Sequence, residues 1–121
     1  MRKLLSIAFI AMLFYSCSNG QNNSTYKTSL SATEFASKIK ELPPATILDV
    51  RTADEFSKGH LINALNYDWN GSEFDKQIAP LDKSKPVFVY CLSGGRSSSA
   101  ASKMRSDGFA QVYEMDGGIM K

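Results

Sequence analysis

The sequence has few cysteines and almost no excess of either charge. Its 121 residues include two cysteines and carry a formal net charge of +2. Without Arg2 and Lys3, 12 of the 14 basic residues remain against 12 acidic ones, so the net charge identifies no partner. There is no basic run or arginine-rich helix, which argues against nucleic-acid binding. Apolar residues make up 43%, as in globular proteins, and the length suits one domain.

The sequence also lacks an apolar run long enough to span a bilayer. Residues 4–15 are apolar except for Ser6 and follow the positive pair Arg2-Lys3, a pattern typical of export signals. The small residue Ser16 before Cys17 resembles the lipobox of bacterial lipoproteins, although residues 14–15 are bulkier than usual. We interpret residues 1–16 as a signal peptide, 17–27 as a polar tether and 28–121 as the folded domain.

This interpretation makes Cys17 a lipidation site and the protein an exported, membrane-anchored lipoprotein, with its domain on the periplasmic side. A plain secretory signal or an uncleaved anchor are the alternatives. With lipid on Cys17, Cys91 is the only free thiol and no internal disulfide can form. A lone thiol in an exported protein is either a buried apolar side chain or a reactive group.

Short apolar runs alternate with helical patterns along residues 28–121. Ser31 and Glu34 fit a capping box at the start of the first helix, and the pair Pro43-Pro44 ends it. The sequence predicts strands at residues 46–50, 61–66, 86–91 and 111–115, and later helices at 53–56, 73–78 and 97–107. This alternation indicates an α/β fold with a mostly parallel central sheet flanked by helices.

Cys91 ends the strongest predicted strand and precedes the loop Leu92-Ser-Gly-Gly-Arg96, which leads into a helix. Ligands of open α/β sheets bind beyond the carboxyl ends of strands, and helix N-termini attract anions. Loop N–H groups that point inward, the helix N-terminus and the Arg96 guanidinium all favour a thiolate, which is the nucleophilic form of cysteine. We therefore predict that Cys91 is a nucleophile.

The run Cys91-Leu-Ser-Gly-Gly-Arg-Ser97 resembles the active-site loop of rhodanese-homology domains. Two further motifs appear in the family's order: the segment from Asp49 to Asn66 and the pair Gly117-Gly118. The resemblance implies a three-layer rhodanese-like domain and a sulfurtransferase. It would pass sulfane sulfur from thiosulfate or a persulfide to a thiophilic acceptor, such as a thiol or cyanide, through a Cys91 persulfide.

The same resemblance implies that the loop binds the anionic sulfur donor and that no metal or organic cofactor is needed. The residues expected to bind the donor are Leu92, Ser93, Gly94, Gly95, Arg96 and Ser97. Asp49 and Arg51 are expected to support the loop structurally. We expect Glu55 and His60 to fix a helix and a turn and to take no part in catalysis.

The chain departs from the family pattern at two places. Asn63 stands where the family usually has glycine, and asparagine tolerates the left-handed conformation that such a turn needs. The family continues past its glycine pair into a final helix, whereas here only residues 119–121 follow. We therefore expect the C-terminal helix to be absent and the stability to be lower than usual.

Two other functions fit parts of the pattern. A carrier module would hold sulfur or an anion at the loop and depend on a partner protein for turnover. Related cell-cycle phosphatases have one residue more between the cysteine and the arginine. The shorter loop here suits a single sulfur atom better than a phosphate, and the lone thiol argues against redox chemistry.

Overall fold

Five parallel strands form the centre of the structure, a computed structural model that describes residues 27–120. Their order across the sheet is β1-β5-β4-β2-β3. The strands are β1 (Ser29–Leu30), β2 (Thr46–Asp49), β3 (Leu65–Asn66), β4 (Val87–Tyr90) and β5 (Val112–Met115). The predicted α/β fold, with a parallel sheet flanked by helices, is confirmed. The predicted signal peptide, Cys17 and all of the tether except residue 27 lie outside the described residues.

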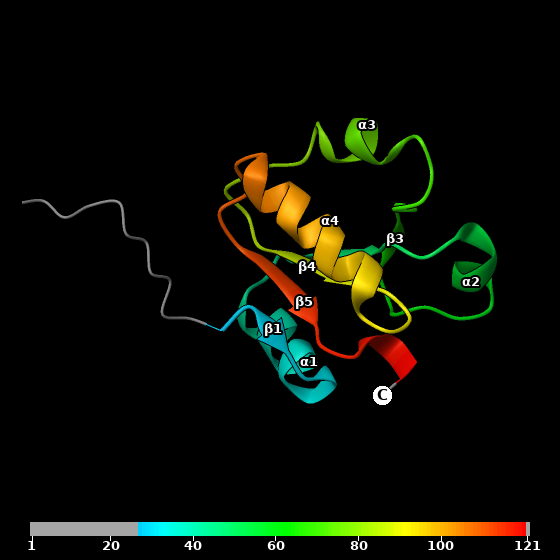
Figure 1. The fold of residues 1–121 in the computed structure, drawn as a ribbon. Coiled ribbons are helices and arrows are strands. Elements are labelled where there is room, and N and C mark those ends of the chain that lie inside the picture. The colour runs from blue at the N-terminus through cyan, green and yellow to red at the C-terminus, as the bar shows by residue number, and fades with distance from the viewer. Residues whose placement is uncertain (1–26, 121) are drawn as a thin grey trace, which may run out of the picture.

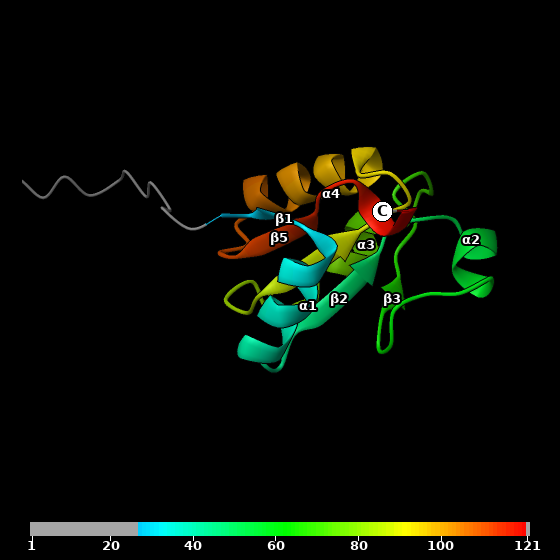
Figure 2. The same cartoon turned by 90° about the horizontal axis from the view of Figure 1, so that it is seen from below.

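Helices cover both faces of the sheet (Figures 1 and 2). α1 (Ala32–Glu41) packs on one face, and α3 (Phe74–Ile78) and α4 (Gly95–Ser106) pack on the other. The short α2 (Ala53–Ser57) follows β2 beyond its carboxyl end. Within residues 27–120, no helix combines the length and the hydropathy needed to cross a membrane.

The side chains of β4 alternate between the two faces, as a strand requires. Val87, Val89 and Cys91 lie in the apolar cluster beneath α3 and α4. Phe88 and Tyr90 lie in the cluster beneath α1. All five side chains are almost completely buried. The strand that carries Cys91 is therefore held rigidly from both sides.

Local sequence signals place the ends of α1 and α2. Ser31 and Glu34 form the predicted capping box of α1, and Thr52 and Glu55 form a second one at α2. Asn63 adopts the left-handed conformation, with φ of 67°, as expected for a residue in the place of a glycine.

Two predicted elements differ from the structure, and one strand was not predicted. The predicted helix at 97–107 begins two residues earlier, because Gly94 adopts φ of 107° and its carbonyl accepts from Ser98 N at 3.0 Å. The predicted strand at 61–66 contains only β3, since a turn from residue 61 to 64 occupies its first half. β1 was not predicted, because two residues carry no detectable period. After β5 the described chain ends in the 3-10 turn η1 (Gly118–Met120).

Candidate active site

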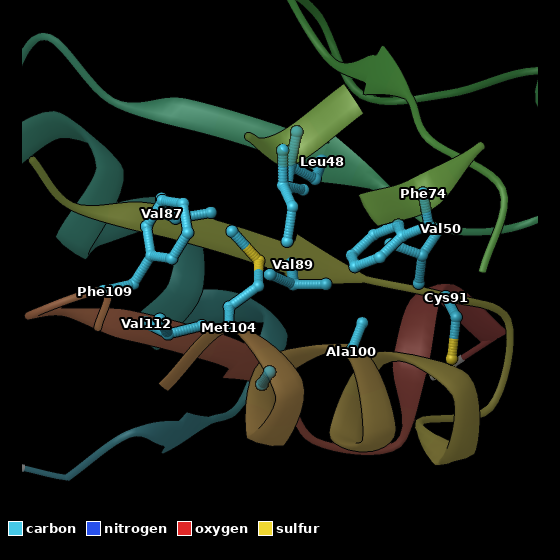
Figure 3. Close-up of a cluster of buried hydrophobic side chains, with 12 residues drawn as sticks. Leu48, Val50, Phe74, Val87, Val89, Cys91, Ala100, Met104, Phe109 and Val112 are labelled. Carbon is cyan, nitrogen blue, oxygen red and sulfur yellow. The ribbon is translucent and has the colours of Figure 1, made fainter. Parts of the chain in front are cut away.

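Cys91 lies immediately after β4, at the carboxyl edge of the sheet. Figure 3 shows it at the end of a row of buried side chains between the sheet and α4. Its exposed fraction is 0%, whereas the neighbouring Ser93 and Gly95 are exposed. The thiol therefore lies at the base of an exposed loop, and the rigid strand behind it fixes its position.

Several hydrogen-bonding groups converge on the sulfur atom of Cys91. The backbone N–H of Gly94 donates to Sγ at 3.1 Å, and that of Ser97 donates at 3.3 Å. The thiol donates to the Ser97 hydroxyl at 3.4 Å, and that hydroxyl donates to the Gly94 carbonyl at 3.2 Å. Gly94 reaches this geometry because it adopts φ of 107°, which few other residues tolerate. The first turn of α4 and its cap thus enclose the sulfur with donors.

These donors determine the ionisation of the thiol. Burial alone raises the pKa of Cys91, and it is the largest single influence. The Ser97 hydroxyl and the backbone N–H groups of Ser97, Gly94 and Ser93 act in the opposite direction and together outweigh it. The pKa of Cys91 therefore lies below its ordinary value, which favours the reactive thiolate.

Arg96 is paired with a carboxylate beside the loop. The sequence predicts that its guanidinium favours a Cys91 thiolate, and in the structure both terminal nitrogens bind the carboxylate of Glu55, at 2.8 and 3.0 Å. Glu55 raises the pKa of Arg96, and the negative charge of a Cys91 thiolate contributes less. The groups in contact with the sulfur are backbone and hydroxyl dipoles, and Arg96 lies further out with its own partner.

Asp49 and Arg51 form a buried ion pair next to the site, with 2.6 Å between Arg51 Nη2 and Asp49 Oδ2. Arg51 also donates to the Gly59 carbonyl at 2.7 Å. The hydroxyl of Tyr90 donates to Asp49 at 2.7 Å and accepts from the backbone N–H of Leu61 at 3.0 Å. This network ties the segment after β2 to the strand that precedes Cys91, as a supporting role requires.

The turn after the glycine pair holds the loop from a third side. Ile119 N donates to the Cys91 carbonyl at 2.9 Å, and Met120 N donates to the Leu92 carbonyl at 3.1 Å. Gly118 is buried with φ of 70°. A Cβ at this position would lie 2.6 Å from Ser93 N and still closer to the Leu92 carbonyl. Only glycine therefore allows this turn to pack against the loop.

The remaining predicted residues fall into two groups. Leu92 and Gly95 belong to the loop and the first helical turn, but neither forms a hydrogen bond with Sγ. The Leu92 carbonyl accepts from Met120 N instead. His60 lies away from the sulfur, where its ring stacks on Phe56 at 3.6 Å and its Nδ1 contacts the Phe56 carbonyl. Within residues 27–120, no three His, Cys, Asp or Glu side chains gather into a metal-binding group.

An apolar groove of about 430 Å³ lies on the opposite face of the sheet. Phe35 and Ile39 of α1 line it together with Leu61, Ile62 and Ile119. Its lining includes neither Cys91 nor residues 92–97. Ile119 connects the two regions, because it lines the groove and its N–H donates to the Cys91 carbonyl.

Sequence relatives point to one family. The family model of the rhodanese-like domain matches residues 31–121. The chain is 36% identical over 92 residues to the thiosulfate sulfurtransferase GlpE of Pseudomonas savastanoi, covering 68% of this chain and 85% of that protein. It is 28% identical over 118 residues to the uncharacterized protein YqhL of Bacillus subtilis, covering 98% of this chain and 90% of that protein.

Solved structures show the same architecture. The fold superimposes on a rhodanese-related protein from Thermoplasma volcanium with a TM-score of 0.66, at 29% identity, covering 77% of this chain and 87% of that chain. It also matches the rhodanese-like domain of an Anabaena protein with a TM-score of 0.67, at 29% identity, covering 78% of this chain and 71% of that chain.

Proposed function

Because this chain belongs to the rhodanese-like domain family, we propose that it is a sulfurtransferase with Cys91 as its nucleophile. The observation that carries the proposal is the set of N–H donors on Sγ, from Gly94 and Ser97. These donors stabilise the thiolate, and we expect the same loop to bind the outer sulfur of a persulfide. The similarity to proteins named thiosulfate sulfurtransferase supports the same chemistry.

In the first half-reaction, the Cys91 thiolate attacks the terminal sulfur of thiosulfate. A bond forms between Sγ and that sulfur, and the bond to the sulfonyl sulfur breaks. The electron pair of the broken bond leaves with sulfite, so no oxidant or reductant is consumed. An organic persulfide would react in the same way and release a thiolate.

In the second half-reaction, a thiophilic acceptor attacks the outer sulfur of the Cys91 persulfide. Cyanide would leave as thiocyanate, and a thiolate would leave as a new persulfide. The electron pair of the sulfur–sulfur bond returns to Sγ and regenerates the thiolate. The donors that stabilise Sγ therefore assist this step as well, because they stabilise the leaving group.

The test combines turnover with the mass of the protein. We expect thiosulfate to add one sulfur atom to the chain, and cyanide to remove it with release of thiocyanate. Cys91→Ala should do neither, whereas Ser99→Ala, an exposed position on the same helix, should behave like the wild type. Equal thiocyanate production by wild type and Cys91→Ala would refute the proposal.

One observation favours a carrier role as the second candidate. Cys91 is completely buried, so an acceptor must approach through the loop, and a partner protein could be needed to open it. A carrier would gain the sulfur atom in the mass measurement yet release little thiocyanate. The same experiment therefore separates the two candidates.

We also propose that the domain works at a membrane surface on the periplasmic side, attached through lipid on Cys17. The support is the N-terminal sequence pattern alone, an apolar run that ends at Ser16-Cys17. Expression of the full chain in a bacterium fed a labelled fatty acid should give a labelled, membrane-bound product. Cys17→Ser should abolish the label, and an unlabelled wild-type protein would refute the lipid anchor.

A further inference from the structure

The carboxylate of Glu55 covers the cationic group of the candidate site. Its two oxygens bind Arg96 Nη1 and Nη2 at 2.8 and 3.0 Å. Both side chains are about a quarter exposed, 24% for Arg96 and 27% for Glu55, so the pair lies at the solvent side of the buried thiol. The two residues are 41 positions apart in the chain, and the fold brings them together.

The position of Glu55 is fixed by the helix to which it belongs. Its carboxylate also accepts from the backbone N–H of Thr52 at 3.1 Å and from the Thr52 hydroxyl at 3.0 Å. Glu55 is thus held by the start of α2 while it binds Arg96. Because the carboxylate is already restrained, its pairing with the guanidinium costs little additional conformational entropy.

Glu55 stays charged throughout the working pH range. Its hydrogen bond with Arg96, followed by that with the Thr52 backbone, lowers its pKa to about 2. Asp68 adds a second negative charge near the same guanidinium. The positive charge of Arg96 is therefore largely offset before any donor arrives.

We propose that Glu55 is a specificity-determining residue that disfavours doubly charged sulfur donors relative to singly charged ones. The inference rests on the proposed sulfurtransferase function and names its preferred substrate class. The donors on Sγ are dipoles that suit one sulfur atom, so the rest of an anionic donor must face Arg96. A thiosulfate dianion meets the Glu55 carboxylate there, whereas a monoanionic thiosulfonate or persulfide meets half the repulsion.

The matched probes are thiosulfate and methanethiosulfonate. Both present a terminal sulfur to the Cys91 thiolate, and the sulfur–sulfur bond breaks in both cases. The electron pair leaves with sulfite from thiosulfate and with methanesulfinate from methanethiosulfonate. The two donors differ by one negative charge and otherwise transfer the same atom, so their ratio of kcat/KM reports the charge of the site.

The variant is Glu55→Gln, because glutamine retains the capping box of α2 and removes the charge. It also replaces one of the two oxygens that accept from Arg96 with an amide nitrogen. We expect kcat/KM for methanethiosulfonate to rise about twofold and that for thiosulfate about fourfold, mainly through KM. The second factor is the square of the first because a dianion feels twice the potential; twofold is typical of one partly exposed charge. Both increases should shrink at high salt, which screens exposed charges.

The control is Glu34→Gln, which makes the same change at the same capping position in α1. Glu34 pairs with Lys27 and has no contact with Arg96 among the described residues. The kcat/KM for both donors should therefore stay unchanged. Asp68→Asn is a second variant. It should raise kcat/KM for the two donors in the same sense as Glu55→Gln, with the larger increase for thiosulfate. Asparagine keeps the side-chain oxygen that accepts from Asn70 N.

An equal change for both donors in Glu55→Gln, or a lower kcat/KM for thiosulfate, would overturn the inference and make Glu55 a purely structural or orienting residue. That outcome leaves sulfur transfer itself intact, because both donors would still load Cys91. If neither donor adds sulfur to the wild-type protein, the proposed function fails and this inference fails with it.

Discussion

Gly118→Ala should disable the site although it changes no side chain that contacts the sulfur. A Cβ there would lie 2.6 Å from Ser93 N, where ordinary contacts begin at 3.4 Å, and closer still to the Leu92 carbonyl. The obstacles are backbone atoms, so no side chain can rotate away. The loop must therefore move by on the order of 1 Å, and misplacements of that size cost about 100-fold in rate.

The assay is the rate at which Cys91 reacts with iodoacetamide or gains sulfur from thiosulfate at neutral pH. We expect both rates to fall about 100-fold, since movement of Ser93 and its neighbours withdraws the N–H donors from Sγ. Alanine at positive φ also costs about 1–2 kcal/mol in stability, so that effect needs its own control.

Gly108→Ala supplies this control. Gly108 has φ of 101°, and a Cβ there meets only the flexible end of Lys83 at 3.6 Å. The variant should lose a similar amount of stability and retain the reactivity of Cys91. If Gly118→Ala reacts within about twofold of Gly108→Ala, well short of the 100-fold loss, the loop does not depend on the turn in the way described here.

Three further outcomes follow from the same contacts. Ser97→Ala should slow alkylation of Cys91 near neutral pH by about tenfold, since a hydrogen bond to a charged group contributes about 1.5 kcal/mol at the low end; Ser99→Ala should not. The pH profile of that alkylation should have its midpoint below pH 9.0, the ordinary pKa of the thiol, because the site lowers the pKa and only the thiolate reacts; a midpoint above 9.0 would contradict this. Arg51→Met should lower the free energy of unfolding by about 3–5 kcal/mol, because it leaves the buried Asp49 carboxylate without its partner. In urea denaturation, the double variant Arg51→Met/Asp49→Asn should lose less stability than the sum of the losses of the two single variants.

Local patterns predicted the scaffold well. The capping box of Ser31 and Glu34, the apolar period of β4 and the placement of Cys91 at a strand end are all encoded within a few neighbouring residues. Asn63 likewise adopts the left-handed conformation expected of it. Signals of this kind need no knowledge of tertiary structure, which is why the alternation of helices and strands after β1 could be predicted from the sequence.

The contacts that the sequence did not predict join segments that lie far apart in the chain. Glu55 was expected only to help fix a helix and a turn, and its contact with Arg96 spans 41 residues. The packing of Gly118 against Leu92 and Ser93 joins a later turn to the loop. No local period reveals such pairs. The one available signal was the presence of an acidic residue and an arginine in separate motifs of the same family.

The geometry separates two tasks that the sequence assigned to a single loop. Neutral dipoles from Gly94 and Ser97 hold the thiolate, whereas the charge of Arg96 is taken up by Glu55. The two N–H groups lie 3.1 and 3.3 Å from Sγ, and their stabilisation of the thiolate is lost after a small displacement. Activation of the sulfur therefore depends on the position of the backbone. Charge acts over a longer range, so Glu55 and Arg96 govern which anion enters. Changes to the backbone should therefore act mainly on kcat, and changes to the ion pair mainly on KM.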